Sequence, residues 1–119
     1  MSAPNLILTN SIYGNTTYLS TSTMSPQIVL TNSAGSGSAY KLNTVMVANP
    51  NAVNIPITVD VTRGASNYYL AANVTVPGFS SLVVQAKDTA IYLIEGDALR
   101  CNVGAAYTCH FTVSYEVIS

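Results

Sequence analysis

The sequence predicts an all-β protein, an antiparallel β-sandwich with a jelly-roll-like arrangement of about eight short strands. Two observations predict this class. Apolar residues recur at every second position, as in strands with one buried face, and not at the 3.6-residue spacing of a helix. Turn-forming residues separate these runs at nearly regular intervals, which is typical of sandwiches and jelly rolls. No segment carries a helical pattern longer than one turn.

The alternation is clearest in two central runs, where apolar residues occupy every second position: Ile55, Ile57, Val59 and Val61 in the first, and Tyr68, Leu70, Ala72, Val74 and Val76 in the second. Similar runs predict strands at 27–31, 40–49, 81–85, 90–94, 98–103 and 107–117. Turn residues lie between them, at 33–38, 49–51, 63–64, 77–78, 87–88 and 95–97. Pro56 lies inside a run and predicts that this strand is an edge strand or carries a bulge.

The first 26 residues differ from the rest, so the chain divides into an N-terminal segment, 1–26, and a β-sandwich domain, 27–119. Leu6-Ile-Leu has the composition of a strand, whereas 11–25 is a polar stretch rich in Ser and Thr. This segment is either a first strand with a long connection or an extended arm that pairs with a neighbouring subunit. Sheet edges with so few charges favour association unless something covers them, and a partner subunit is the simplest cover.

Charged residues make up only 8% of the chain, against about 25% in typical domains. Polarity comes instead from Ser, Thr and Asn, and the net charge is −1. The few cations are scattered, which argues against a nucleic-acid partner, and no apolar run reaches the roughly 18 residues that a membrane span needs. The start, Met1-Ser-Ala-Pro, lacks the pattern of a secretion signal, so we expect synthesis in a reducing cytoplasm. A near-neutral surface of this kind suits a protein that works in an assembly.

Both cysteines and the only histidine occur in one stretch, CNVGAAYTCHFTV (101–113). If Gly104-Ala-Ala is a hairpin loop, Cys101 lies opposite Cys109 on the core face, while His110 points to the other face. Adjacent strand residues cannot converge on one ion, and two thiolates are too few for a zinc site. We therefore predict two buried, inert thiols, with a strained cross-strand disulfide or a metal or redox site as alternatives. His110 is expected to be an exposed polar residue.

The remaining residues show no arrangement typical of an enzyme. Glu95-Gly-Asp97 is the only close carboxylate pair; it predicts an ordinary turn, with calcium binding as the alternative. There is no G-x-S-x-G motif, and a triad with the single histidine is not plausible. We expect no catalytic residue, no cofactor and no metal.

Eight tyrosines occur in a chain without tryptophan. Tyr68 and Tyr69 are adjacent on a strand and point to opposite faces, so at least one of them reaches the surface. Surface tyrosines anchor protein interfaces and can stack on sugars.

Five segments from Ala39 onward share a rhythm of strands and turns with a known group of proteins: AYKLNTVMVANPN (39–51), VDVTRGASNYYLAANVTVP (59–77), SSLVV (80–84), IYLIEGDALR (91–100) and VSYEVIS (113–119). Together they resemble small accessory virion proteins of tailed bacteriophages, of the capsid decoration or cement type, including those of phages that infect cyanobacteria. IYLIEGDALR is the most distinctive piece. Residues 1–26 and the two cysteines are not part of the resemblance.

The resemblance implies a structural virion protein that decorates and stabilises a phage capsid by bridging capsid subunits through surface contacts. Its partners would be the major capsid protein or other virion proteins, and the chain itself would form a trimer or dimer. The alternatives are a tail, neck or baseplate component, or a small carbohydrate-binding module for host attachment that uses Tyr68 or Tyr69 with Asn67 and Asn73. The candidate interface residues are Tyr13, Tyr18, Tyr69, Asn73, Arg63 and His110.

Overall fold

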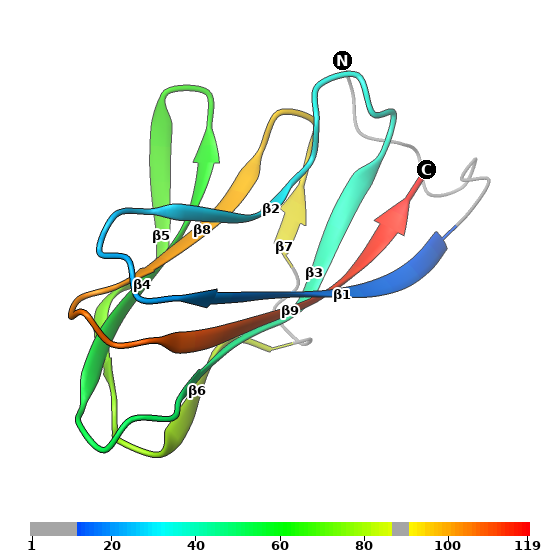
Figure 1. Ribbon diagram of the computed structural model, residues 1–119. Helices are drawn as coiled ribbons and strands as arrows, with labels where there is room; N and C mark the ends of the chain where they lie inside the picture. Colours follow the sequence, from blue (N-terminus) through cyan, green and yellow to red (C-terminus); the bar gives the residue numbers. More distant parts are fainter. Residues whose placement is uncertain (1–11, 87–90) are drawn as a thin grey trace.

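The computed structural model describes residues 12–86 and 91–119, which form strands and turns without a helix. The strands pack as two antiparallel sheets, face to face, so the predicted all-β sandwich is confirmed (Figure 1). Their bounds are β1 Ile12–Thr21, β2 Gln27–Thr31, β3 Ala39–Asn49, β4 Ile55–Arg63, β5 Ser66–Val76, β6 Ser80–Gln85, β7 Ile91–Leu93, β8 Ala98–Val103 and β9 Cys109–Ile118.

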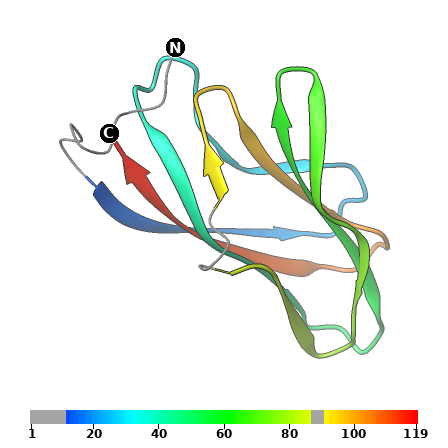
Figure 2. The same ribbon diagram turned by 180° about the vertical axis from the view of Figure 1, so that it is seen from behind.

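The connectivity is that of a jelly roll, because most successive strands lie in different sheets. A five-stranded sheet has the order β1-β9-β3-β6, with β7 also paired to β3, and a four-stranded sheet has the order β2-β8-β4-β5. β7 pairs with the first part of β3 and β6 with its last part, and Figure 2 shows the two beside β3, one beyond the other. They therefore fill one strand position, and the nine strands of the described residues occupy the eight positions of the fold.

The core lies between the sheets and is built from alternate residues of the central strands. On β4, β8 and β9 the odd-numbered apolar residues are buried, as the period-2 pattern predicts. The largest side chains with no more than 1% exposure are Phe111, Leu42, Ile55, Ile57, Leu93 and Leu99. Each such side chain contributes about 1.5–3 kcal/mol to folding through removal of apolar surface from water.

The predicted hairpin between 98–103 and 107–117 is wrong, because β8 and β9 belong to different sheets. Residues 104–108 cross from one sheet to the other, and Gly104 N donates to Pro56 O (2.7 Å) on β4. Cys101 pairs with Gln27 and Val59, whereas Cys109 pairs with Thr21. Alternation shows which side of a strand faces the core, but it does not show which strand lies next to it. Both cysteines are buried and free, so the disulfide alternative is also wrong.

The predicted buried face of β5 is wrong at most of its positions. Tyr68 and Val74 are exposed, and Ala71 is buried in place of Ala72. The register between β4 and β5 shifts twice, between Ile57 and Val59 and between Val59 and Asp60. Each shift is a bulge with an extra residue on β5: the first along β5 turns Ala71 to the core in place of Ala72, and the second restores the original sides. Tyr68 and Val74 therefore face Val61 and Ile57 on the core side as predicted, but they remain exposed.

Pro56 lies on β4, which is an interior strand between β5 and β8, so the edge-strand alternative is wrong. The β4–β5 ladder does contain a bulge that begins at the next residue, Ile57, with the extra residue on β5. Pro56 is the second residue of β4 and faces Thr75 of β5. The pairing of β4 with β8 begins only at Ile57. A proline is tolerated near the beginning of an interior strand because it lies outside the ladder that would need its missing N–H group.

Within the segment 1–26, β1 pairs with β9 of the same chain over its whole length, from Ile12 opposite Ile118 to Thr21 opposite Cys109. Ile12–Thr21 is therefore an edge strand of the five-stranded sheet, and residues 22–26 form the turn that leads to β2. The strand expected at Leu6-Ile-Leu lies outside the described residues.

Candidate functional site

The two thiols are buried on the inner faces of different sheets and are poor nucleophiles. Burial, with a smaller contribution from the nearby carboxylate of Asp60, raises the pKa of Cys101 to about 12. Burial also raises the pKa of Cys109. Because only the thiolate attacks electrophiles or binds metals, neither thiol is activated at neutral pH. Within 12–86 and 91–119, no group of three His, Cys, Asp or Glu side chains is placed to hold a metal ion.

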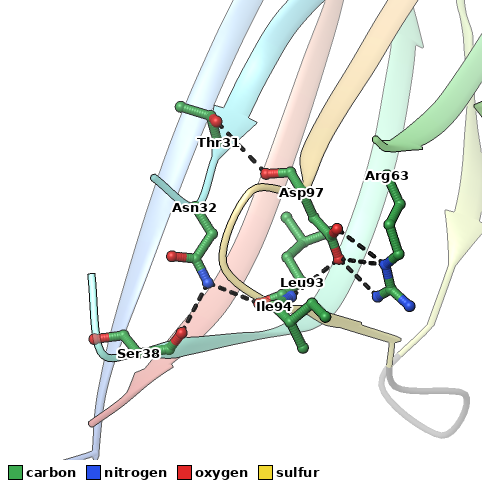
Figure 3. A network of polar contacts seen from close by, with 7 residues as sticks. All are labelled: Thr31, Asn32, Ser38, Arg63, Leu93, Ile94 and Asp97. Atoms are coloured by element: carbon green, nitrogen blue, oxygen red, sulfur yellow. Dashed lines mark hydrogen bonds and ion pairs between the residues drawn. The ribbon is translucent and has the colours of Figure 1, made fainter. Parts of the chain in front are cut away.

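The Glu95-Gly96-Asp97 turn uses both carboxylates to hold the fold, and Figure 3 shows the contacts of Asp97. Asp97 N donates to Ile94 O (3.0 Å), and this hydrogen bond closes the turn. The turn predicted at residues 95–97 is therefore confirmed. The Asp97 carboxylate is 1% exposed and accepts from Ile94 N and from the guanidinium of Arg63, the shortest contact being 2.7 Å. The Glu95 carboxylate accepts from the backbone N–H groups of Gly35 and Gly37 instead. The two acids therefore point to different partners.

Arg63, a candidate interface residue, is held by this turn. Its guanidinium contacts Asp97 through both Nε and Nη2, while about half of its side chain remains exposed. The hydrogen bond to Asp97 raises the pKa of Arg63, and partial burial opposes this only in part. The position of Arg63 is therefore explained by the buried carboxylate that it neutralises.

Tyr18 and His110 lie on the outer face of the five-stranded sheet, in neighbouring rows. One row crosses all four strand positions and runs Tyr18, Thr112, Met46 and Val83. The next row runs Ser20, His110, Ala48 and Ser81. Tyr18 is 73% exposed and Val83 is also exposed. We call these two rows the outer apolar face; they contain hydroxyl groups, apolar side chains and one imidazole.

Tyr13 lies elsewhere, near the end of β1. It faces Val117 of β9, which in turn faces Tyr40 of β3. Tyr40 stacks on Tyr115 with ring centroids 5.4 Å apart, and the hydroxyl of Tyr115 accepts a hydrogen bond from Asn15 Nδ2 (3.2 Å). Burial, with Tyr40 and Tyr13 nearby, raises the pKa of Tyr115. Tyr13 is exposed and borders a tyrosine cluster that packs on the core.

Tyr69 and Asn73 meet in a groove on the outer face of the four-stranded sheet. The groove has a volume of about 520 Å³, and its walls are formed by Met24, Pro26, Thr58, Asp60, Asn67, Tyr69, Ala72, Asn73, Arg100 and Asn102. We call it the polar groove. Tyr69 is 62% exposed, so its ring is available to a ligand.

An ion pair forms the floor of the polar groove. Ile28, Arg100, Asp60 and Tyr69 form one row across the four-stranded sheet. Arg100 donates from Nε to Asp60 Oδ1 (3.0 Å) and from Nη2 to Asp60 Oδ2 (2.6 Å). This hydrogen-bonded contact raises the pKa of Arg100. Both charges are fixed in place, and they cancel each other.

The two bulges of β5 create the wall of the polar groove. Opposite Thr58, β5 carries both Ala72 and Asn73, and Asn73 has a left-handed backbone with φ of 54°. Asparagine adopts this conformation more readily than other side chains. Asn73 N donates to Thr58 Oγ1 (3.0 Å), which fixes the bulge. Bulges of this kind re-aim side chains and are frequent beside functional sites.

The sequence prediction grouped only part of this site. It associated Tyr68 or Tyr69 with Asn67 and Asn73; Tyr69 and both asparagines line the polar groove, whereas Tyr68 does not. It missed Asp60 with its partner Arg100, although both occupy outward positions in runs that are otherwise apolar on the inward side. It also missed Met24, because the turn that brings residues 22–26 beside β8 through Asn102 Nδ2 and Met24 O (3.1 Å) has no signal in the sequence.

Comparison with known proteins gives no relative: no family model, no curated protein and no solved structure matches the chain. In the described part of the chain, we find no helix with the length and apolar character to cross a membrane.

Proposed function

We propose that this chain is a structural virion protein that decorates a phage capsid and stabilises it by bridging capsid subunits. The observation that carries the proposal is the outer apolar face, where Tyr18, Met46 and Val83 form one uncharged row with Thr112 across the five-stranded sheet. The sequence resemblance to accessory virion proteins supports the same function. Jelly rolls occur in viral capsid domains, but this is an analogy of fold and not of site.

The first row of the outer apolar face, Tyr18, Thr112, Met46 and Val83, has a composition that fits the centre of a protein interface. The centres of protein interfaces are depleted in charge and enriched in Tyr and Met, and an exposed tyrosine is a frequent hot spot. The charged pair on this side of the sheet, Lys41 and Glu116, lies at the far end of the β3–β9 ladder. A partner that covers the two rows therefore desolvates no carboxylate or ammonium group.

The proposed mechanism is burial of surface across the boundary between two capsid subunits. A protein that binds only the assembled shell stabilises that shell by an amount that grows with its affinity and concentration. A contact of standard size buries about 800 Å² on each partner.

Purified particles of the phage that encodes the chain test this function. We expect many copies per particle by quantitative mass spectrometry, and we expect particles lacking the protein to lose their DNA at a lower temperature. Tyr18→Ser should reduce the occupancy of the particle, whereas Tyr107→Ser, at an exposed tyrosine in the β8–β9 connection, should leave it unchanged. A few copies per particle would indicate a tail, neck or baseplate component instead, and absence from the particle would refute a virion role.

A further inference from the structure

We propose that the polar groove on the four-stranded sheet binds a neutral saccharide, with the ring of Tyr69 as the stacking platform and Asn67, Asn73 and the Asp60–Arg100 pair as hydrogen-bonding groups. This goes beyond the proposed structural role, because it assigns a ligand to a different face of the molecule.

The size and construction of the polar groove fit a small ligand. A volume of about 520 Å³ lies within the range of about 300–1,000 Å³ found for small-molecule sites. Its floor is made by residues of two central strands, β4 and β8, which are paired on both sides. Its wall is formed by the two bulges of β5 and is held by the hydrogen bond from Asn73 N to Thr58 Oγ1. The ion pair of the floor therefore stands on interior strands, and Tyr69, Asn67 and Asn73 stand on the edge strand β5, which is paired to β4.

The polar groups of the groove complement hydroxyl groups. A sugar hydroxyl both donates and accepts hydrogen bonds, and a side-chain amide does the same. The side-chain amides of Asn67 and Asn73 make no hydrogen bond to any described residue. Arg100 donates to Asp60 from Nε and Nη2, and its Nη1 has no partner within the described ranges. The groove therefore offers unused donors and acceptors beside an exposed aromatic ring.

The charge of the groove favours a neutral ligand. Asp60 and Arg100 are the only charged residues among those that line it, and they neutralise each other at 2.6 Å. A phosphate or sulfate group near Arg100 would meet the Asp60 carboxylate, and an ammonium group would meet the guanidinium. An apolar ligand would cover Arg100 Nη1 and the two amides without offering them hydrogen-bond partners, which is costly. A polyhydroxylated neutral molecule satisfies both the ring and the amides.

The polar groove and the outer apolar face lie on opposite sides of the sandwich, because each is the outer surface of a different sheet. A molecule attached to a particle by the five-stranded sheet would present the four-stranded sheet to solvent. The two sites can therefore be occupied at the same time, and each can be tested without the other.

An array of immobilised neutral and anionic glycans, probed with the full-length protein, tests this proposal. Each hit is then titrated as the free oligosaccharide by NMR, with the backbone amides of β4, β5 and β8 as reporters. We expect a neutral glycan to bind at or below about 10 mM, an affinity of a few kcal/mol, and to shift amide signals around the groove. Binding of anionic glycans only, or no neutral glycan bound at that concentration by the folded protein, would overturn the proposal.

Four variants localise the binding. Tyr69→Ala should weaken it about tenfold or more, through loss of the stacking platform, and Tyr69→Trp should retain it because a larger ring replaces the phenol. Tyr68→Ala is the matched control, because Tyr68 is the neighbouring exposed tyrosine and points to the opposite face. Asn73→Gly removes the amide while keeping the left-handed backbone, and should also weaken binding. Equal effects of Tyr68→Ala and Tyr69→Ala would place the glycan outside the groove. Failure of glycan binding leaves the occupancy of the particle unaffected, so the two proposals fail separately.

Discussion

Asn32→Asp is expected to destabilise the protein strongly at neutral pH, although it only replaces the side-chain NH2 group with an oxygen and leaves the volume almost unchanged. Asn32 has no exposed surface. Its side-chain Nδ2 donates to Ser38 O and to Leu93 O, both at 2.9 Å (Figure 3). An aspartate has the same shape, but its carboxylate only accepts hydrogen bonds. The substitution therefore places a negative oxygen against two buried carbonyl oxygens that have lost their donor.

The magnitude follows from these two contacts. A buried acceptor without a donor costs about 1–3 kcal/mol, so two such carbonyls cost about 4 kcal/mol together, before the burial of the charge is counted. A domain of this size is stable by only about 5–15 kcal/mol. The repulsion raises the pKa of the new carboxyl above its unfolded value. The loss is therefore largest at neutral pH and shrinks as the pH falls toward about 4, where the protonated group donates to one carbonyl.

Urea denaturation followed by far-UV circular dichroism at about pH 7 and about pH 4 measures this effect. Asn54→Asp is the matched control, because Asn54 Oδ1 accepts from Gly78 N (3.1 Å) and a carboxylate accepts equally well. That variant should stay within about 0.5 kcal/mol of the original protein. If Asn32→Asp costs no more than Asn54→Asp, or if its cost is independent of pH, the donor role of the Asn32 amide is refuted.

Two further predictions concern the core and one turn. Because the pKa of Cys101 is raised to about 12, its buried thiol contributes stability that is present below about pH 9 and is lost as the pH rises toward 12. The loss of stability is up to about 4 kcal/mol. In urea titrations between about pH 9 and 12, the free energy of unfolding should fall less steeply with pH for Cys101→Ala than for the original protein. An equal pH dependence in the two proteins would contradict this prediction. Gly78→Ala should cost about 1–3 kcal/mol, because its Cβ would lie 2.8 Å from the backbone of Ala52. Gly14→Ala, whose Cβ would meet nothing closer than 4.0 Å, is the control and should leave the stability unchanged. Thermal unfolding of both variants measures this. If Gly78→Ala costs no more stability than Gly14→Ala, the crowding at Gly78 is relieved by a shift of the turn, and the prediction is wrong.

The sequence predicted the side on which most residues lie, but not which strands are neighbours. Alternation is a local property with a period of two residues, so it placed Leu99, Cys101 and Phe111 in the core without any knowledge of the fold. The neighbour of a strand depends on where its connection goes, and the same stretch 104–108 could close a hairpin or cross between sheets. The stretch crosses between the sheets, and Gly104 N donates a hydrogen bond to Pro56 O on β4, a strand that comes much earlier in the sequence.

The polar groove also depends on contacts between strands that alternation along one strand does not reveal. A strict alternation along β5 would place Tyr69 and Asn73 on one face with Ala71 between them. The two bulges instead bury Ala71 and bring Ala72 and Asn73 together to the wall of the groove. A bulge depends on pairing with Thr58 and Val59 of β4, so residues 66–76 by themselves do not reveal it. The asparagine that tolerates a left-handed backbone is the one local signal.

The scarce charges of this protein are used inside its architecture, and this has a testable consequence for its surface. Among the described residues, Asp60 is paired with Arg100, Asp97 with Arg63, and Glu95 with two backbone N–H groups. Glu116 accepts from Asn43 Nδ2 and faces Lys41 across the β3–β9 ladder. The outer apolar face and the polar groove are therefore left without net charge. Contacts made by such surfaces depend on burial and on hydrogen bonds, which salt screens weakly.

Attachment to particles and binding of a neutral glycan are accordingly expected to persist in about 1 M NaCl, where the Debye length falls to about 3 Å. Sedimentation of decorated particles and NMR titration of the glycan, each at low and high salt, measure this directly. Contacts driven by clustered lysines or carboxylates would instead weaken by orders of magnitude over the same range. Release of the protein at high salt would show that its partner recognises charge, and that the two ion pairs are not the reason for the neutral surface.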